Sequence, residues 1–420
     1  MREVHALDFH SQYVVLRYNG KRVVVHPATM TYPEKKRFHG ASAGFSRQAV
    51  LLLCTVLLIA LFTVTGFLTR AFHLKQQAIA ENWFEKGNAS LAAGHARDAR
   101  DDYRNALIFE PQNTTYQLHL AQALTAFGQP DQSRAYLLNL LTEFPGDGEV
   151  NLELARLATR DGAVTAAIHY YHGAIYGAWD SNPVESRRAA RLELCQFLVN
   201  HGEYIQAEAE LIALAAGIPE DASALHATVG DLFLRAGDAN RALNEFQLSL
   251  KFSTANETAL AGAGTAAYRL NDFKQAAYYL ERARAANPGH AEIAQMLDTS
   301  RAVLGADPFA PNLTEEERAA RAAKALADAL SRAEKCMAPA AKSDASPLQA
   351  LMDRAKAGQR GIWSENGLRL HPEQIPPEMR VVFDIETECD RECGTPEGVD
   401  LALSAIRDLH KDIVYGAPGA

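Results

Sequence analysis

Only a few stretches of the sequence combine residue types and spacing that could do chemistry. The run GASAG at residues 40–44 places Ser42 between glycines, which is the spacing of a serine nucleophile on a sharp strand-to-helix turn. It stands directly before a long apolar segment, without a flanking strand or a domain of hydrolase size. We therefore exclude a serine hydrolase site at this position.

A second candidate lies near the C-terminus, where carboxylates alternate in the run MRVVFDIETEC. We expect a strand here, and a strand would bring Asp384, Glu386 and Glu388 to one face because its side chains alternate. Such a face could bind a cation, but a solvated acidic face is the simpler interpretation and the one we favour. If this C-terminal part were an enzyme, Asp384, Glu386 and His410 would be its first catalytic candidates.

Cysteines supply the third candidate. Cys389 and Cys393 are separated by three residues, and no second pair has the spacing of zinc ligands. In an oxidising compartment Cys336 can form a disulfide with Cys389 or Cys393, whereas in a cytosolic domain all three would be free thiols. We expect a disulfide, with Cys336 and Cys393 as the candidate pair. The reason is that the membrane orientation predicted below places this region outside the cytoplasm. The sequence predicts no enzyme, no metal site and no cofactor.

The overall composition is that of a folded protein. Of 420 residues, 48% are apolar and 22% are charged, and the net charge is −9. This balance gives no sign of a basic surface of the kind that binds nucleic acids. No nucleic-acid partner is predicted.

One segment departs from that average. Residues 49–68 read AVLLLCTVLLIALFTVTGFL, and twenty helical residues span about 30 Å, the thickness of a bilayer core. The run is longer than the apolar core of a cleaved signal peptide and lacks its small-x-small exit. A soluble helix of this length would have a polar face. We predict an uncleaved transmembrane helix over residues 49–69.

Basic residues near the two ends of this helix predict its orientation. Those on the N-terminal side are Lys35, Lys36, Arg37 and Arg47, and those on the other side are Arg70 and Lys75. Because basic residues concentrate on the cytoplasmic side, residues 1–48 should be cytoplasmic. The chain would then be a single-pass membrane protein, with the long part after the helix on the other side of the membrane.

The region beyond the anchor contains a 34-residue period. Counted from Ala80, small residues fall at positions 8 and 20 (Gly87 and Ala99), an aromatic falls at position 24 (Tyr103), and Pro111 falls at position 32. The small residues let two helices approach closely and the aromatic fills the space beside them. Proline ends the second helix because it has no N–H to donate to the preceding turn.

The arrangement returns in units that start at Thr114, Gly148, Arg188, Ser223 and Glu257. A short insertion, SNPVES at residues 181–186, shifts the register before the fourth of the six units. An unrelated helical bundle would have no reason to keep a fixed period. The pattern resembles the tetratricopeptide repeat (TPR), a helix–turn–helix unit.

The resemblance implies a TPR solenoid over residues 80–305, with about six helix pairs closed by a capping helix in AEIAQMLDTSRAVLG. The fold class is then an all-α solenoid with one N-terminal transmembrane helix and a small C-terminal α+β or disordered region. Such solenoids have an extended concave face that binds peptides or helices. The first helix of each pair lines that face.

Carried onto this chain, the resemblance assigns the groove residues Asn88, Gln122, Arg156, Thr159, Arg160, Gln196, Asn200, Asp231, Arg235, Tyr268 and Arg269. The arginines would make the groove locally basic and suit an acidic or C-terminal-carboxylate peptide. The alternative is that they are solvated side chains on helix surfaces. Family members that bind heat-shock chaperones use a Lys/Asn carboxylate clamp, of which only Asn88 is matched here. Docking of that kind is not expected.

The remaining segments are predicted individually. Residues 13–27 alternate around Asn19-Gly20, which predicts a β-hairpin, and residues 70–79 are a linker. Residues 306–336 form a long helix that begins with a capping box of Thr314 and Glu317. Residues 337–347 have the composition of a linker. Residues 348–420 form the small C-terminal region.

The arrangement as a whole resembles bacterial inner-membrane proteins with one N-terminal anchor and an exported TPR domain. It implies a membrane-tethered scaffold or adaptor in the envelope that binds protein segments and acts in assembly, translocation or a chaperone-like role. Two alternatives stay open. The C-terminal lobe is an enzyme that the TPR array positions, or the array is an adaptor that faces the cytoplasm.

Overall fold

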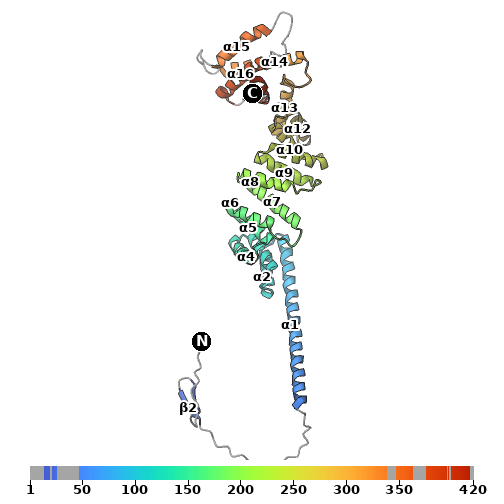
Figure 1. Cartoon of the computed structure of the whole chain (residues 1–420), viewed down its shortest axis with the longest axis vertical. Coiled ribbons are helices and arrows are strands. Elements are labelled where there is room, and N and C mark those ends of the chain that lie inside the picture. The colour runs from blue at the N-terminus through green and yellow to red at the C-terminus, as the bar shows by residue number, and fades with distance from the viewer. Residues whose placement is uncertain are drawn as a thin grey trace, which may run out of the picture. The chain divides into compact units, whose positions relative to one another are not determined.

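The computed structural model describes residues 14–18, 21–25, 47–337, 347–362, 375–394, 396 and 399–416, and the chain divides into two compact units, residues 1–76 and 77–420 (Figure 1). In the first unit, β1 (Val14–Tyr18) and β2 (Lys21–Val25) pair antiparallel, with Tyr18 opposite Lys21. This pairing confirms the predicted hairpin. The Asn19-Gly20 turn and the GASAG run lie outside the described residues.

Helix α1 (Arg47–Ala92) begins with the apolar segment. It is long and apolar enough to cross a membrane, and none of its most apolar window is buried. Its threonine hydroxyls donate to carbonyls of the preceding turn, as Thr55 does to Leu52 at 2.9 Å and Thr69 to Thr65 at 2.8 Å. These bonds satisfy the hydroxyls within the helix, as a lipid environment requires.

Residues 70–79, for which a linker is predicted, are helical and belong to α1. The stretch RAFHLKQQAI contains neither glycine nor proline and is rich in good helix formers, so nothing in it interrupts the helix. The same helix therefore continues into the first repeat.

The second unit contains the predicted helix pairs. Its solenoid helices are α2 (Ala96–Phe109), α3 (Thr114–Ala126), α4 (Pro130–Glu143), α5 (Gly148–Arg160), α6 (Val164–Tyr176), α7 (Pro183–Asn200), α8 (Tyr204–Ala215), α9 (Ser223–Ala236), α10 (Ala239–Phe252), α11 (Glu257–Arg269), α12 (Phe273–Ala286) and α13 (Ala291–Ala306). The first residues of α3, α5, α9 and α11 are the predicted unit starts. In the fourth unit the inserted residues lengthen α7, which starts at Pro183.

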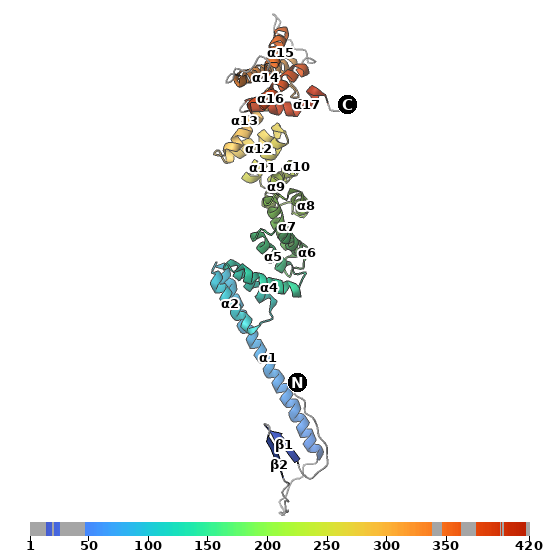
Figure 2. The ribbon, with the colours of Figure 1, turned by 90° about the vertical axis from the view of Figure 1, so that its left-hand side faces the viewer.

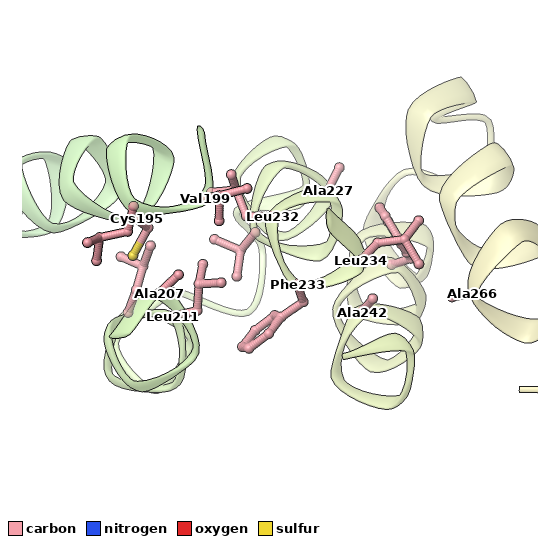
Figure 3. Close-up of a cluster of buried hydrophobic side chains, with 14 of the residues drawn as sticks. Cys195, Val199, Ala207, Leu211, Ala227, Leu232, Phe233, Leu234, Ala242 and Ala266 are labelled. Carbon is pink, nitrogen blue, oxygen red and sulfur yellow. The ribbon is translucent and has the colours of Figure 1, made fainter. Parts of the chain in front are cut away.

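Close approach within a pair is clearest where position 8 is glycine, at Gly87, Gly230 and Gly264; in the other pairs this position is alanine or cysteine. A Cβ added to Gly87 would lie 2.5 Å from the Tyr103 ring, and one added to Gly264 would lie 2.6 Å from Leu280. Both partners are the residues predicted at position 24. Between units the packing is continuous: side chains of α7 to α11, among them Cys195, interleave in one buried cluster (Figure 3).

Beyond the solenoid the described residues form α14 (Glu315–Met337), α15 (Pro347–Ile362), α16 (Ile375–Cys393) and α17 (Val399–Tyr415). We call these four helices the C-terminal bundle. The capping box is confirmed, because the Thr314 amide donates to Glu317 Oε2 at 2.8 Å and the Glu317 amide donates to Thr314 Oγ1 at 3.2 Å. The linker predicted after α14 lies mostly outside the described residues.

The strand predicted in MRVVFDIETEC is wrong, because this stretch lies in α16. Met379, Phe383 and Glu386 are buried at helical spacing against the other bundle helices, and this packing overrides the β-branched run that suggests a strand. As a further correction, Asp384 and Glu386 do not share a face, since residues two apart on a helix point in different directions.

A disulfide joins Cys336 at the end of α14 to Cys393 at the end of α16, with 5.9 Å between their Cα atoms. Cys389 is buried one turn earlier on α16. Beside the disulfide, the buried guanidinium of Arg332 pairs with Glu386 and donates to Asp390 at 2.8 Å. The bond and the ion pairs connect the same two helices.

Candidate partner-binding site

The predicted groove residues lie on the first helices of the pairs, α1, α3, α5, α7, α9 and α11. Figure 2 shows α5, α7, α9 and α11 following one another along the array. From α3 onward, each of these helices is joined to the next by a polar contact. Gln122 on α3 donates to Glu149 and Glu153 on α5, both at 3.2 Å. Arg156 on α5 donates to both carboxylate oxygens of Glu193 on α7, at 3.0 and 2.6 Å.

The series continues to the end of the array. Arg235 on α9 hydrogen-bonds Asn200 on α7, and Arg269 on α11 donates to the Leu234 carbonyl on α9 at 2.8 Å. We call this row of side chains the polar ladder, made of Gln122, Glu149, Glu153, Arg156, Glu193, Asn200, Arg235 and Arg269. It shows that the predicted residues from successive units lie side by side.

The electrostatics of the polar ladder differ from a purely basic groove. The Arg156 guanidinium contacts Glu153 at 2.9 Å as well as Glu193, and its hydrogen bonds to Glu193 raise the pKa of Arg156. Arg235 lies 3.6 Å from Asp231. Burial raises the pKa of the Glu153 carboxyl despite the adjacent arginine. Two of the four predicted arginines are therefore already opposed by carboxylates.

Other predicted groove residues have structural contacts. Asn88 accepts a hydrogen bond from the Tyr103 hydroxyl at 2.8 Å, and burial raises the pKa of Tyr103 to about 12. Tyr268 is half-buried and packs edge-on against Phe273, 5.7 Å between ring centres. Gln196 and Arg160 are exposed.

A pocket of about 450 Å³ lies at one edge of the array, between the loop that joins α4 to α5 and the loop that joins α6 to α7. We call it the loop pocket. Its lining residues are Glu143, Phe144, Pro145, Gly146, Asp147, Glu149, Ala178, Trp179, Asp180 and Ser181. Sequence reasoning missed it. The signals were Trp179, which stands where most units have proline, and the insertion that follows it.

Backbone hydrogen bonds hold the two loops of the pocket together. The Gly148 amide donates to the Ala178 carbonyl and the Ala178 amide donates to the Gly146 carbonyl, both at 2.8 Å. The Trp179 indole N–H donates to the Ala174 carbonyl at 2.8 Å. A Cβ on Gly148 would lie 2.3 Å from the indole nitrogen, so glycine is needed there for the ring to fit.

The candidate catalytic residues of the C-terminal region are not brought together. Asp384 accepts from the Tyr415 hydroxyl at 2.7 Å, Glu386 pairs with Arg332, and His410 lies 3.0 Å from Asp307. Within the described residues, no three His, Cys, Asp or Glu side chains form a group that could hold a metal ion. Asp384 and Glu386 have contacts within the bundle, and His410 contacts the C-cap residue of α13.

Similarities to known proteins cover about half of the chain. No family model matches the chain. Cellulose synthase operon protein C of Komagataeibacter xylinus is 26% identical over 234 residues, which cover 52% of this chain and 18% of that protein. The chain therefore matches less than a fifth of that relative's length.

Among solved structures, PilF of Pseudomonas aeruginosa is 16% identical and covers 52% of this chain and 97% of its own, with a TM-score of 0.41. PilW, a type IV pilus biogenesis factor, is 18% identical over 52% of this chain and 98% of its own, with a TM-score of 0.40. The succession of helix pairs, with small residues packed at position 8, establishes the fold within this chain itself. The chain has the fold of a tetratricopeptide repeat solenoid, with one apolar helix near its N-terminus that is long enough to cross a membrane.

Proposed function

We propose that this protein is a membrane-tethered scaffold that binds segments of other proteins along its polar ladder. The observation that carries the proposal is the row of polar contacts from Gln122 to Arg269, which joins the first helices of five successive units. A row of side chains held in this way presents hydrogen-bonding groups at fixed positions. A partner therefore binds them with a smaller loss of side-chain conformational entropy.

The mixed charge of the polar ladder bears on the partner. An acidic peptide would have to compete with Glu153 and Glu193 for Arg156. Arg160 and Arg269 remain exposed on the same face. We infer that the ladder recognises a segment by its pattern of hydrogen bonds and alternating charges, and that a uniformly acidic peptide is a poorer ligand.

The tether in this proposal is the apolar part of α1, residues 49–69, with the N-terminus in the cytoplasm and the solenoid in the periplasm. Its support is the unburied apolar window and the basic residues on its N-terminal side. The partial similarity to a cellulose synthase operon protein is compatible with a role beside an envelope assembly system.

Paired substitutions test the ladder. Arg156→Ala with Arg160→Ala should leave the fold intact, because both side chains are exposed, and should weaken partner capture from the native membrane. The matched control is Arg241→Ala on α10, which removes an exposed arginine that pairs with Glu208 on the second helix of the preceding unit. Unchanged partners in the double variant would contradict the proposal.

A further inference from the structure

We propose that the loop pocket receives a lysine or arginine side chain of the bound protein segment. This inference rests on the proposed function, because it supplies one anchor of the segment that lies on the polar ladder. It stands on three properties of the pocket together: its volume, its apolar walls and the sign of its charge.

The volume and walls suit a long side chain with an apolar stem. The pocket of about 450 Å³ is walled by Phe144, Pro145 and Trp179. Phe144 is 43% exposed, so its ring is accessible to a side chain that enters the pocket. The hydrogen bond of Trp179 to Ala174 and the contact with Gly148 fix the indole, so this wall is preformed.

The charge of the lining is entirely negative. Four of the ten lining residues are carboxylates (Glu143, Asp147, Glu149 and Asp180), and none is Lys, Arg or His. One of them, Asp147, already accepts from the Glu149 and Val150 amides at 2.9 Å and caps α5. The other three supply the attraction for a cation.

No arginine lines the pocket, so none neutralises its carboxylates from within. Arg187 donates to the Gly177 carbonyl at 2.9 Å and is not among the lining residues. An acidic side chain would be repelled, and an aliphatic one would cover carboxylates without pairing them, which costs desolvation energy. Lysine and arginine combine an apolar stem with a cationic end, and they also bind aromatic faces.

The pocket is continuous with the polar ladder through one residue. Glu149 lines the pocket and also accepts a hydrogen bond from Gln122 at 3.2 Å. A segment that lies across α3 and α5 can therefore place a side chain in the pocket. This arrangement gives the partner a basic residue at a defined point of an otherwise mixed sequence.

The test is peptide binding to the full-length protein in detergent micelles. The probe is a fluorescein-labelled ten-residue peptide that alternates arginine with alanine, and its anisotropy reports binding. One matched peptide carries citrulline, the neutral isostere of arginine, and another carries glutamate. We expect the arginine peptide to bind most tightly and to weaken as salt is added, because the carboxylates are partly exposed.

Charge removal localises the binding. Glu143→Gln with Asp180→Asn should reduce the affinity for the arginine peptide about five- to tenfold, the effect of about one kcal/mol. The matched control is Glu220→Gln with Asp221→Asn, which neutralises two exposed acids in the next loop of the same kind, between α8 and α9, outside the pocket. The control should bind as tightly as the wild type.

Removal of the aromatic wall distinguishes binding in the pocket from general attraction of the peptide to an acidic protein. Phe144→Ala keeps every carboxylate and should still weaken the arginine peptide, whereas attraction to the acidic protein as a whole would be unaffected. Equal binding of arginine and citrulline peptides would overturn the inference. So would an absence of binding, or equal losses in the pocket and control variants. The proposed function has its own test. If the Arg156→Ala, Arg160→Ala variant loses its partners, the proposed function holds even when the pocket inference fails.

Discussion

The solenoid and the C-terminal bundle are both helical, but different interactions hold them together. In the solenoid, neighbouring helices pack through small residues, as Gly264 does against Leu280, and the same repeat positions pack in other units, as Gly87 does against Tyr103. In the bundle, the buried Arg332 pairs with Glu386, 54 residues away, and a disulfide closes a separation of 57 residues. Local repeated packing spreads the stability over many positions, whereas the bundle depends on a few long-range connections.

The largest effect is expected at the buried charge of the bundle. Arg332→Ala would leave Glu386 buried without this guanidinium, which costs about 3–5 kcal/mol. Hydrogen exchange should show α14, α16 and α17 losing protection while α9 to α11 keep it. Equal loss in both regions would show that they form one cooperative unit. Arg241→Ala, in an exposed pair, is the control and should change little.

Loss of the disulfide should come next. Cys336→Ser removes the cross-link between two cysteines that are 57 residues apart in the sequence. It should destabilise the bundle by about 2–4 kcal/mol, mainly because the unfolded chain gains conformational entropy. The measurement is chemical denaturation of the full chain, followed by exchange in α14 and α16. Cys195→Ser in the solenoid is the contrasting variant, since its effect should be confined to α7 and α8. A bundle as stable as before would show that the disulfide makes no contribution.

Overpacking tests the repeat register in the solenoid. Gly264→Leu would push α11 from α12 and should cost about 1–3 kcal/mol in thermal unfolding. The control is Gly305→Leu on α13, where an added Cβ meets nothing within 4 Å. If both variants unfolded at the wild-type temperature, the assignment of Gly264 to a helix contact would be wrong.

The smallest effect is a pH dependence from the polar ladder. Burial raises the folded-state pKa of Glu153 above its unfolded value, so the folded chain holds this proton at higher pH than the unfolded chain does. Its contribution should therefore favour folding as the pH falls through the folded pKa, and the gain should be complete below the unfolded pKa. Glu153→Gln should flatten that part of the stability curve. An unchanged curve would show that another group titrates there.

The solenoid could be predicted from the sequence because its rules are local. The unit starts at Thr114, Gly148, Ser223 and Glu257 coincide with helix starts because each repeats the same close-packing positions. The groove residues followed from the same register. The register does not predict the charge balance of the groove, because Arg156 is paired with Glu193, which belongs to the next unit.

The bundle and the loop pocket were harder to predict because both depend on contacts between segments that are far apart in the sequence. In α16, alternating acids and β-branched residues suggest a strand, and only the buried face with Met379 and Phe383 shows the helical period. That face exists because α14 packs on it. The loop pocket likewise depends on the hydrogen bonds between Gly148 and Ala178, which connect two loops 30 residues apart. Neither contact leaves a periodic signal in the sequence.

The proposed function requires that partners bind the face that carries the polar ladder. Photo-crosslinking amino acids at Gln196 on that face, and at Ile205 on α8 as the outer control, test it in the native host; Ile205 is 89% exposed. We expect envelope proteins to crosslink from position 196 and not from position 205. Identical partners from both positions would contradict binding on the ladder face, and cytosolic partners alone would contradict the proposed topology.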